Sequence, residues 1–229
     1  MDPLLQRLQA LDSCVVSDAL DRLGLHGAAL GIGRLWPCPR VAGRLLTVAL
    51  APVEDVSAKP VTHLGARAIE AAGPEHVIAV ANGGRLQMAA WGGLLSRAAR
   101  QRGVRGVVVD GSCRDVDEAI ELRFPLFARG AVPRTARGRV TEVATGAPVE
   151  IAGTVVAEGD LVIADASGVV FIPAGRATAV LDAAEALARR EAELASALER
   201  GAAVTEVLGG DYERMLQATT DDGRASRLS

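Results

Sequence analysis

The chain has 229 residues, of which 49% are hydrophobic and 23% are charged, so it can bury a core and is not a disordered protein. Its formal net charge of −3 argues against a protein that binds nucleic acid by neutralising phosphates. We find no signal peptide and no apolar run of the roughly 20 residues that span a membrane, so we expect a cytoplasmic protein. The three cysteines show no CxxC spacing, which favours reduced thiols and no zinc site.

Helices and a strand are predicted in the first 50 residues. Apolar periodicity predicts amphipathic helices at residues 4–11 and 17–23, and Ser17 is a suitable N-cap for the second. Residues 41–50 have the composition of a strand, in which Gly43 is a candidate for a β-bulge.

A loop, a helix and a second strand are predicted next. Residues 52–60 begin and end with proline and are predicted to form a loop, and residues 63–72 are predicted to form a helix that ends at Gly73-Pro74. The apolar run at 77–81 predicts a short strand, which Asn82-Gly83-Gly84 would end.

The stretch from residue 91 to residue 118 contains the strongest pattern in the chain. Gly92 and Gly93 precede a run of good helix formers at 94–102, so a helix is predicted there. Residues 104–109 are apolar and β-branched, which is typical of a strand buried on both faces. Residues 110–112 are predicted to turn, and Arg114-Asp115 to open a second helix.

The lengths of these elements place their ends together. A helix of about nine residues rises roughly 14 Å, and a strand of about six or seven residues returns roughly 20 Å. The pair Gly92-Gly93 should therefore meet Arg114-Asp115 at one end of the sheet. The amides of a helix start and an arginine suit a small carboxylate ligand, and an aspartate suits a hard divalent cation. The sequence thus predicts a pocket for a metal-bound oxo acid.

The pattern changes after this stretch. Short strands separated by Gly, Pro and Asp are predicted at 126–128, 138–144, 149–151, 161–164 and 169–172. They indicate an α/β fold with mixed strand pairing instead of a doubly wound parallel sheet. Residues 174–200 form a long Ala/Leu/Glu/Arg run that predicts a helix ended by Gly201. We expect a single domain over residues 1–217 and a flexible tail at 218–229.

The central stretch resembles the RraA-like family, which includes 4-hydroxy-4-methyl-2-oxoglutarate aldolases and regulators of ribonuclease E activity. The aldolase members carry Asp, twenty intervening residues and then Arg-Asp. Here Arg114-Asp115 match, but Gly93 stands in the place of the first Asp. The resemblance extends from about residue 16 to residue 199 and is supported by segments 40–48, 124–129 and 159–173. It implies a swivelling β/β/α-type sandwich that forms homotrimers, or hexamers if the trimers pair, with helix 174–200 packing on a neighbouring subunit.

The resemblance also implies roles for individual residues. Asp115 would bind Mg²⁺ or Mn²⁺, although an aspartate at a helix start is often only a cap. Arg114, otherwise an ordinary surface arginine, would hold the substrate carboxylate and the developing enolate oxygen. Glu191 would approach the metal from the neighbouring subunit, although the composition of the segment around it alone fits a solvent-facing Arg/Glu helix. The segment whose backbone amides would grip the substrate carboxylate comprises Gly92, Gly93, Leu94 and Leu95; its plainer interpretation is a glycine turn before a core helix.

Gly93 is the main departure from the aldolases, whose Asp at this position orders metal-bound water and manages a proton. Glu118 lies three residues beyond Asp115 and could reach the same water. Alternatively, Asp117 and Glu118 form a solvated acidic first turn. Cys113 has no histidine near it in sequence and is interpreted as a small buried residue.

The leading hypothesis is a metal-dependent lyase that cleaves a carbon–carbon bond of a small 2-oxo acid and releases pyruvate. Oxaloacetate decarboxylation needs no base, whereas the aldolase reaction also requires removal of a hydroxyl proton, which Gly93 cannot assist. The alternatives are a non-catalytic regulator of a ribonuclease and a lyase or isomerase that uses the same pocket for a specialised metabolite. The residues leave open which oxo acid and which metal are used.

Overall fold

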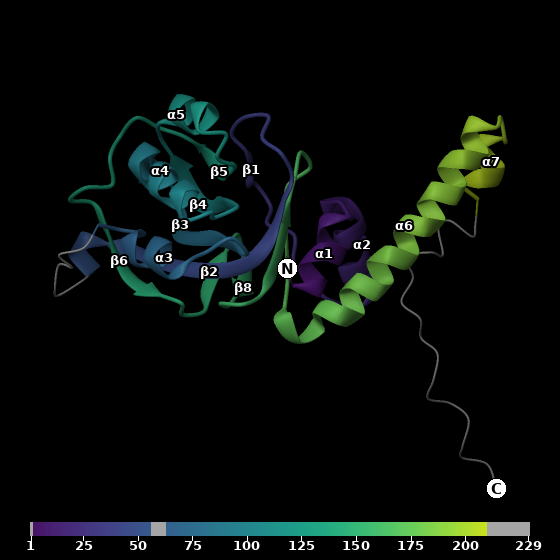
Figure 1. Cartoon of the computed structure of the whole chain (residues 1–229), viewed down its shortest axis with the longest axis horizontal. Helices are drawn as coiled ribbons and strands as arrows, with labels where there is room; N and C mark the ends of the chain where they lie inside the picture. The colour runs from purple at the N-terminus through teal and green to yellow at the C-terminus, as the bar shows by residue number, and fades with distance from the viewer. Residues whose placement is uncertain (1, 56–62, 210–229) are drawn as a thin grey trace, which may run out of the picture.

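The structure is a computed structural model that describes residues 2–55 and 63–209. Figure 1 shows a curled sheet with helices packed against it and one long helix that extends away from it. The predicted tail at 218–229, the end of the predicted 1–217 domain and most of the loop predicted at 52–60 lie outside the described residues. Within the described part of the chain, no helix is both long and apolar enough to cross a membrane.

A mixed sheet of eight strands forms the centre of the fold. Four neighbouring strands are parallel, namely β2 (Val41–Pro52), β3 (His76–Trp91), β4 (Gly106–Cys113) and β5 (Leu126–Ala131). Antiparallel strands continue the sheet beside β5 and β2, namely β1 (Gly33–Arg34), β6 (Val140–Thr145), β9 (Leu161–Ala164) and β10 (Val169–Ile172). A separate hairpin comprises β7 (Val149–Ile151) and β8 (Thr154–Val156). The predicted α/β fold with mixed pairing and a long C-terminal helix is confirmed.

Alternate residues of the strands pack into two different hydrophobic clusters, because successive side chains point to opposite faces of a sheet. On β3, Val77 and Ala79 belong to a cluster built from strands, loops and the β7–β8 hairpin. Ile78 and Val80 belong to a cluster that the sheet shares with helices. This is why the central strands are almost continuously apolar in sequence.

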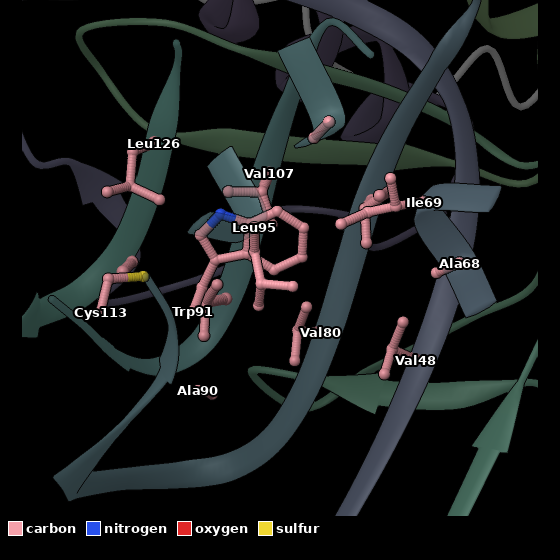
Figure 2. Close-up of a cluster of buried hydrophobic side chains, with 14 of the residues drawn as sticks. Val48, Ala68, Ile69, Val80, Ala90, Trp91, Leu95, Val107, Cys113 and Leu126 are labelled. Carbon is pink, nitrogen blue, oxygen red and sulfur yellow. The ribbon is translucent and has the colours of Figure 1, made fainter. Parts of the chain in front are cut away.

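The helix-covered cluster supports the predicted site. It packs the sheet against α3 (Ala66–Ala71), α4 (Gly93–Gln101) and α5 (Val116–Glu121). Figure 2 shows Trp91 near the centre of this cluster, close to Leu95 from α4 and to strand residues such as Val80. The indole Nε1 of Trp91 donates a hydrogen bond to Ser96 Oγ at 3.0 Å, so the buried ring has a polar partner at the start of α4.

A second helical layer packs against the other part of the sheet. It consists of α1 (Pro3–Gln9), α2 (Ser13–Arg22) and the first half of α6 (Ala177–Glu199), which follows the short 3-10 turn η2 (Ala174–Arg176). The buried residues of α6 end at Leu187, and the remainder of the helix leads to α7 (Val204–Val207), away from the sheet (Figure 1). The first half of the predicted 174–200 helix therefore packs on its own chain, against α1 and α2. The expectation that helix 174–200 packs on a neighbouring subunit stays a prediction.

Several predicted boundaries are wrong, for reasons of tertiary packing. Helix α2 begins at Ser13, because Asp12 caps it by accepting a hydrogen bond from Val15 N at 2.9 Å, and not at Ser17. Strand β4 continues to Cys113, so residues 110–112 do not turn. They pair with β3, which itself continues through Asn82 to Trp91 with shifts of register instead of ending at the glycines. Gly43 is not a bulge.

Gly43 is needed for close approach to the neighbouring strand. A Cβ at this position would lie 2.9 Å from Glu75 O and 2.9 Å from Val77 Cγ2. The register shift in β2 occurs instead between Ala49 and Leu50, where the strand pairs with β6. A glycine inside a strand pattern marks either a β-bulge or a close approach of two backbones, and the sequence alone did not distinguish them at Gly43.

Asp165 connects the start of α2 to the turn between β9 and β10. Its carboxylate accepts hydrogen bonds from Ser13 N at 2.8 Å, from Ser13 Oγ at 2.7 Å and from Ser167 N at 2.9 Å. Burial raises the pKa of Asp165, but the hydrogen bonds from Ser13 and Ser167 together outweigh it, so the pKa is lowered overall.

We expect Asp165→Asn to lower the free energy of unfolding at pH 7 by about 1–3 kcal/mol, because an amide cannot accept all three hydrogen bonds. The folded-state pKa lies below the unfolded value of about 3.9, so the carboxylate stabilises the fold above about pH 4 and loses this effect as the pH falls further. Urea unfolding between pH 3 and pH 7 should therefore show a smaller acid loss of stability in the variant. An equal loss in both proteins would contradict this role of Asp165.

Candidate active site

The carboxyl ends of β3 and β4 bring the two halves of the predicted site together. Trp91 and Cys113 are paired across these parallel strands, and Arg114 N donates a hydrogen bond to Trp91 O at 3.0 Å. The residues that follow each strand are therefore side by side: Gly92 and Gly93 at the start of α4, and Asp115 before α5. The meeting of these pairs that the element lengths predicted is observed.

Asp115 connects the starts of two helices. Its backbone has φ 58° and ψ 43°, in the left-handed region, which Asp tolerates better than most residues. Its side chain does not cap α5; instead Oδ2 accepts a hydrogen bond from Gly93 N at 2.9 Å and lies 3.2 Å from Arg114 Nε. The interpretation of Asp115 as an ordinary cap of its own helix is therefore wrong.

Side chains pack directly against both glycines. A Cβ at Gly92 would lie 2.8 Å from Asp115 Oδ2, closer than real Cβ contacts, and 3.1 Å from Arg114 Nε, so the ends of these side chains would have to shift. A Cβ at Gly93 would overlap Oε2 of Glu118 and lie 2.5 Å from its Cδ. The carboxylate of Glu118 thus fills the space into which a side chain at position 93 would project.

Glu118 is held in this position by an ion pair. Its Oε1 lies 2.7 Å from Arg97 Nη2, while its side chain is 30% exposed. A solvated acidic first turn therefore describes the exposed Asp117 but not Glu118. Glu118 is not among the residues that line the pocket described next; its carboxylate lies behind Gly93.

Arg114 and Asp115 line an open pocket of about 420 Å³. The first wall carries the predicted site, Gly92 to Leu95 with Arg114 and Asp115. Leu95 is buried in the helix-covered cluster, whereas the side chain of Leu94 is 81% exposed. The remaining lining residues are Val53, His63, Leu64, Ala89, Ala90, Trp91, Thr135, Ala136, Arg137, Gly138, Val140, Thr141 and Glu142.

The wall formed by β6 and the loop before it was not predicted. Its Glu142 is buried and accepts hydrogen bonds from Gly65 N at 2.6 Å, from Arg67 Nε at 2.8 Å and from Thr145 Oγ1 at 2.6 Å. The available signal was alternation, because Glu142 lies two residues after the buried Val140 and hence on the same face of the strand. A charged residue on such a face indicates a structural or functional partner.

The donors at the first wall fit a hard divalent cation held mainly by water. Among the described residues there is no group of three or more His, Cys, Asp or Glu side chains that could hold a metal ion. Asp115 contributes a carboxylate that is 39% exposed and whose Oδ1 has no hydrogen bond from the described residues. Mg²⁺ usually binds through one or two carboxylates and keeps several waters, so this arrangement fits Mg²⁺ or Mn²⁺ and not a dedicated protein cage.

Glu191 is not brought to this pocket within one chain. It lies on α6, on the opposite side of the sheet from α4 and α5 (Figure 1). Burial raises its pKa, and the negative charges of Asp18 and Asp12 on and before α2 raise it further.

Cys113 is fully buried, and burial also raises the pKa of its thiol, which agrees with a packing role.

A family model described as RraA-like (Aldolase/RraA) matches residues 13–171. The chain belongs to the RraA-like family. This RraA-like chain is 30% identical over 206 residues to protein DlpA of Legionella pneumophila, a match that covers 90% of this chain but only 33% of DlpA. It is 30% identical over 179 residues to a Halalkalibacterium halodurans protein named "Putative 4-hydroxy-4-methyl-2-oxoglutarate aldolase", covering 78% of this chain and 80% of that protein.

A solved structure supports the fold of this RraA-like chain. The crystal structure of Streptomyces coelicolor RraAS2, described as an unusual member of the RNase ES inhibitor RraA protein family, superposes with a TM-score of 0.76 at 28% identity. The match covers 86% of this chain and 98% of that one. The family thus contains proteins named as aldolases and proteins named as ribonuclease inhibitors.

Proposed function

We propose that this RraA-like protein is a divalent-metal-dependent lyase that cleaves a carbon–carbon bond of a small 2-oxo acid and releases pyruvate. The observation that carries the proposal is the Asp115 carboxylate, held between Gly93 N and Arg114 Nε and open to a pocket. The relatives named as aldolases support it.

The first wall of the pocket would hold the negative charge of the substrate. Helix α4 begins at Gly93, whose N–H is donated to Asp115, and Leu94 and Leu95 of its first turn line the pocket. The amides of a helix's first turn lack acceptors within the helix, so this end of α4 favours an anion. Arg114 adds a planar, permanently charged donor beside it. Together the amides of Leu94 and Leu95 and the guanidinium would bind the substrate carboxylate and stabilise negative charge as it develops on the 2-oxo oxygen.

Asp115 would hold Mg²⁺ or Mn²⁺, with water in the remaining positions. When bound there, the cation supplies Lewis-acid polarisation of the 2-oxo group. Arg114 and the amides at the start of α4 would orient the acid so that its C3–C4 bond, one carbon away from the 2-oxo group, breaks and leaves its electron pair in the enolate of pyruvate. Asp115 also keeps the start of α4 in place, since it accepts the hydrogen bond from Gly93 N.

The two candidate reactions differ in their need for a base. Decarboxylation of oxaloacetate releases carbon dioxide and requires only a proton for the resulting enolate. Retro-aldol cleavage of 4-hydroxy-4-methyl-2-oxoglutarate to two pyruvates also requires removal of the 4-hydroxyl proton. Gly93 has no group for this step, and we assign it to Glu118, whose Oε2 stands where a side chain of residue 93 would project. A water in the pocket would relay the proton.

A neighbouring subunit would complete the site. We propose a homotrimer, or a hexamer of paired trimers, in which the second half of α6, beyond Leu187, carries the half-buried Glu191 toward the Asp115 of the next copy. This assembly explains why α6 continues for three turns beyond its last buried residue, Leu187.

A regulator of a ribonuclease is the second candidate, favoured by the solved inhibitor structures that share this fold. The intact Arg114-Asp115 pair favours the enzyme, because a regulator that acts only by binding a ribonuclease needs neither an open carboxylate nor a pocket. A lyase or isomerase for a specialised metabolite would use the same residues on a different oxo acid.

The test is pyruvate release from oxaloacetate and from 4-hydroxy-4-methyl-2-oxoglutarate, with Mg²⁺, with Mn²⁺ and with chelator. Decarboxylation by free metal must be subtracted. We expect turnover above this background that chelator abolishes. No turnover with either acid, together with binding of a ribonuclease that does not depend on metal, would replace the lyase by the regulator.

A further inference from the structure

The second wall of the pocket carries one positive charge without a counter-charge. Among the charged residues that line the pocket, Asp115 lies beside Arg114, and Glu142 forms an ion pair with Arg67. The exposed Arg137 lines the same pocket but forms no ion pair with any residue that the structure describes. A cation in this position is available to a ligand.

The loop that presents Arg137 is held in place through its backbone. Ala89 N on β3 donates a hydrogen bond to Arg134 O at 2.8 Å. Arg137 N donates to Thr135 Oγ1 at 3.2 Å, and Arg139 Nη1 donates to Thr135 O at 3.1 Å. The guanidinium of Arg137 takes no part in these contacts and forms no hydrogen bond with the residues that the structure describes, so the backbone of Arg137 is restrained while its side chain is available to a ligand.

We propose that Arg137 is the residue that binds the second carboxylate of these dicarboxylic 2-oxo acids, and that it thereby sets the preference of the pocket for them over their monocarboxylic analogues. The inference rests on the proposed function, which places the first carboxylate at Arg114 and the start of α4. Arginine matches a carboxylate with two parallel hydrogen bonds, and Thr135 and Thr141 of the same wall add hydroxyl groups.

The size of the pocket agrees with a longer acid. Its volume of about 420 Å³ is within the roughly 300–1,000 Å³ of pockets that enclose drug-sized ligands, and exceeds what a three-carbon oxo acid requires. Apolar residues such as Ala89, Leu64 and Val140 also line the pocket, which suits a short carbon chain with a charge at each end.

The first experiment measures binding by calorimetry in the presence of Mg²⁺, with oxalate as a probe of the first wall and 2-oxoglutarate as a probe of both walls. We expect Arg137→Gln to weaken the binding of 2-oxoglutarate by roughly ten- to a hundredfold, as for a lost charge-assisted hydrogen bond. The affinity for oxalate should change less than about twofold. Arg134→Gln is the matched control, because it removes the same charge from an exposed residue of the same loop that does not line the pocket.

The second experiment compares cleavage of 4-hydroxy-4-methyl-2-oxoglutarate with that of 4-hydroxy-4-methyl-2-oxopentanoate, in which a methyl group replaces the second carboxylate. Arg137→Gln should lower kcat/KM for the diacid alone. Equal effects on both acids, no effect on either, or failure of the unaltered protein to bind 2-oxoglutarate would overturn the inference. If 2-oxoglutarate binding depends on Arg137 but neither acid is cleaved, the lyase function is excluded and the diacid subsite stands. If the acids are cleaved and Arg137→Gln changes neither rate, the lyase function stands and the diacid subsite is excluded.

Discussion

Asp115→Asn should lower kcat for metal-dependent pyruvate release by about a thousandfold or more, because a single carboxylate would hold the cation and several kcal/mol of transition-state stabilisation depend on it. Asparagine is the appropriate replacement. It tolerates the left-handed backbone of residue 115, and its amide oxygen can still accept the hydrogen bond from Gly93 N. The variant therefore removes the charge while retaining the local structure.

Asp117→Asn is the matched control, since it removes the same charge from an exposed residue at the start of the same helix. It should keep kcat within about twofold. Binding of Mn²⁺, followed by electron paramagnetic resonance, should be lost in the Asp115 variant and retained in the control. Turnover of Asp115→Asn within tenfold of the unaltered protein would exclude Asp115 as the essential metal ligand.

The meeting of Gly92-Gly93 with Arg114-Asp115 could be predicted from sequence because it follows from local order. Two consecutive strand–helix units with parallel strands must place the carboxyl ends of both strands at one edge of the sheet. Only the composition and length of residues 91–118 enter this argument. The errors at Asn82 and at residues 110–112 did not affect it, because both strands continue to the same edge, ending at Trp91 and Cys113.

The second wall of the pocket could not be predicted in the same way. Thr135, Arg137 and Glu142 reach the pocket because β6 pairs with the end of β2, some 90 residues earlier, and because Ala89 hydrogen-bonds to the loop before β6. Neither contact has a local pattern, since a short alternating strand is compatible with many partners. Alternation could have identified Glu142 as a buried charge, but not what it faces.

The position of Glu118 lies between these cases. Its spacing of three residues from Asp115 suggested a shared helical face, but Asp115 has a left-handed backbone and lies before the helix. What places the Glu118 carboxylate behind Gly93 is the packing of α5 against α4 and the ion pair with Arg97. A glycine where the aldolases carry Asp is therefore accompanied by a carboxylate from another helix in the same space.

Glu118→Ala should lower retro-aldol cleavage of 4-hydroxy-4-methyl-2-oxoglutarate by about a hundredfold or more, the usual contribution of a general base. Decarboxylation of oxaloacetate, which needs no base, should change less than about threefold. The ratio of the two rates is the informative measurement, because damage to the pocket would lower both. Glu121→Ala, an exposed carboxylate on the same helix, is the matched control and should change neither rate.

The double variant Gly93→Asp, Glu118→Ala should recover much of the lost aldolase activity, because it moves the carboxylate from one helix to the other. Gly93 does not have a positive φ, and an aspartate in the first turn of α4 is favoured by the helix dipole, so the backbone accepts the change. Gly93→Asp alone should be less stable than the unaltered protein and than the double variant. Its side chain would overlap Glu118 and place two carboxylates together, at a cost of about 1–3 kcal/mol in the free energy of unfolding. Parallel loss of both reactions in Glu118→Ala, without recovery in the double variant, would mean that Glu118 only supports the packing of α5 against α4.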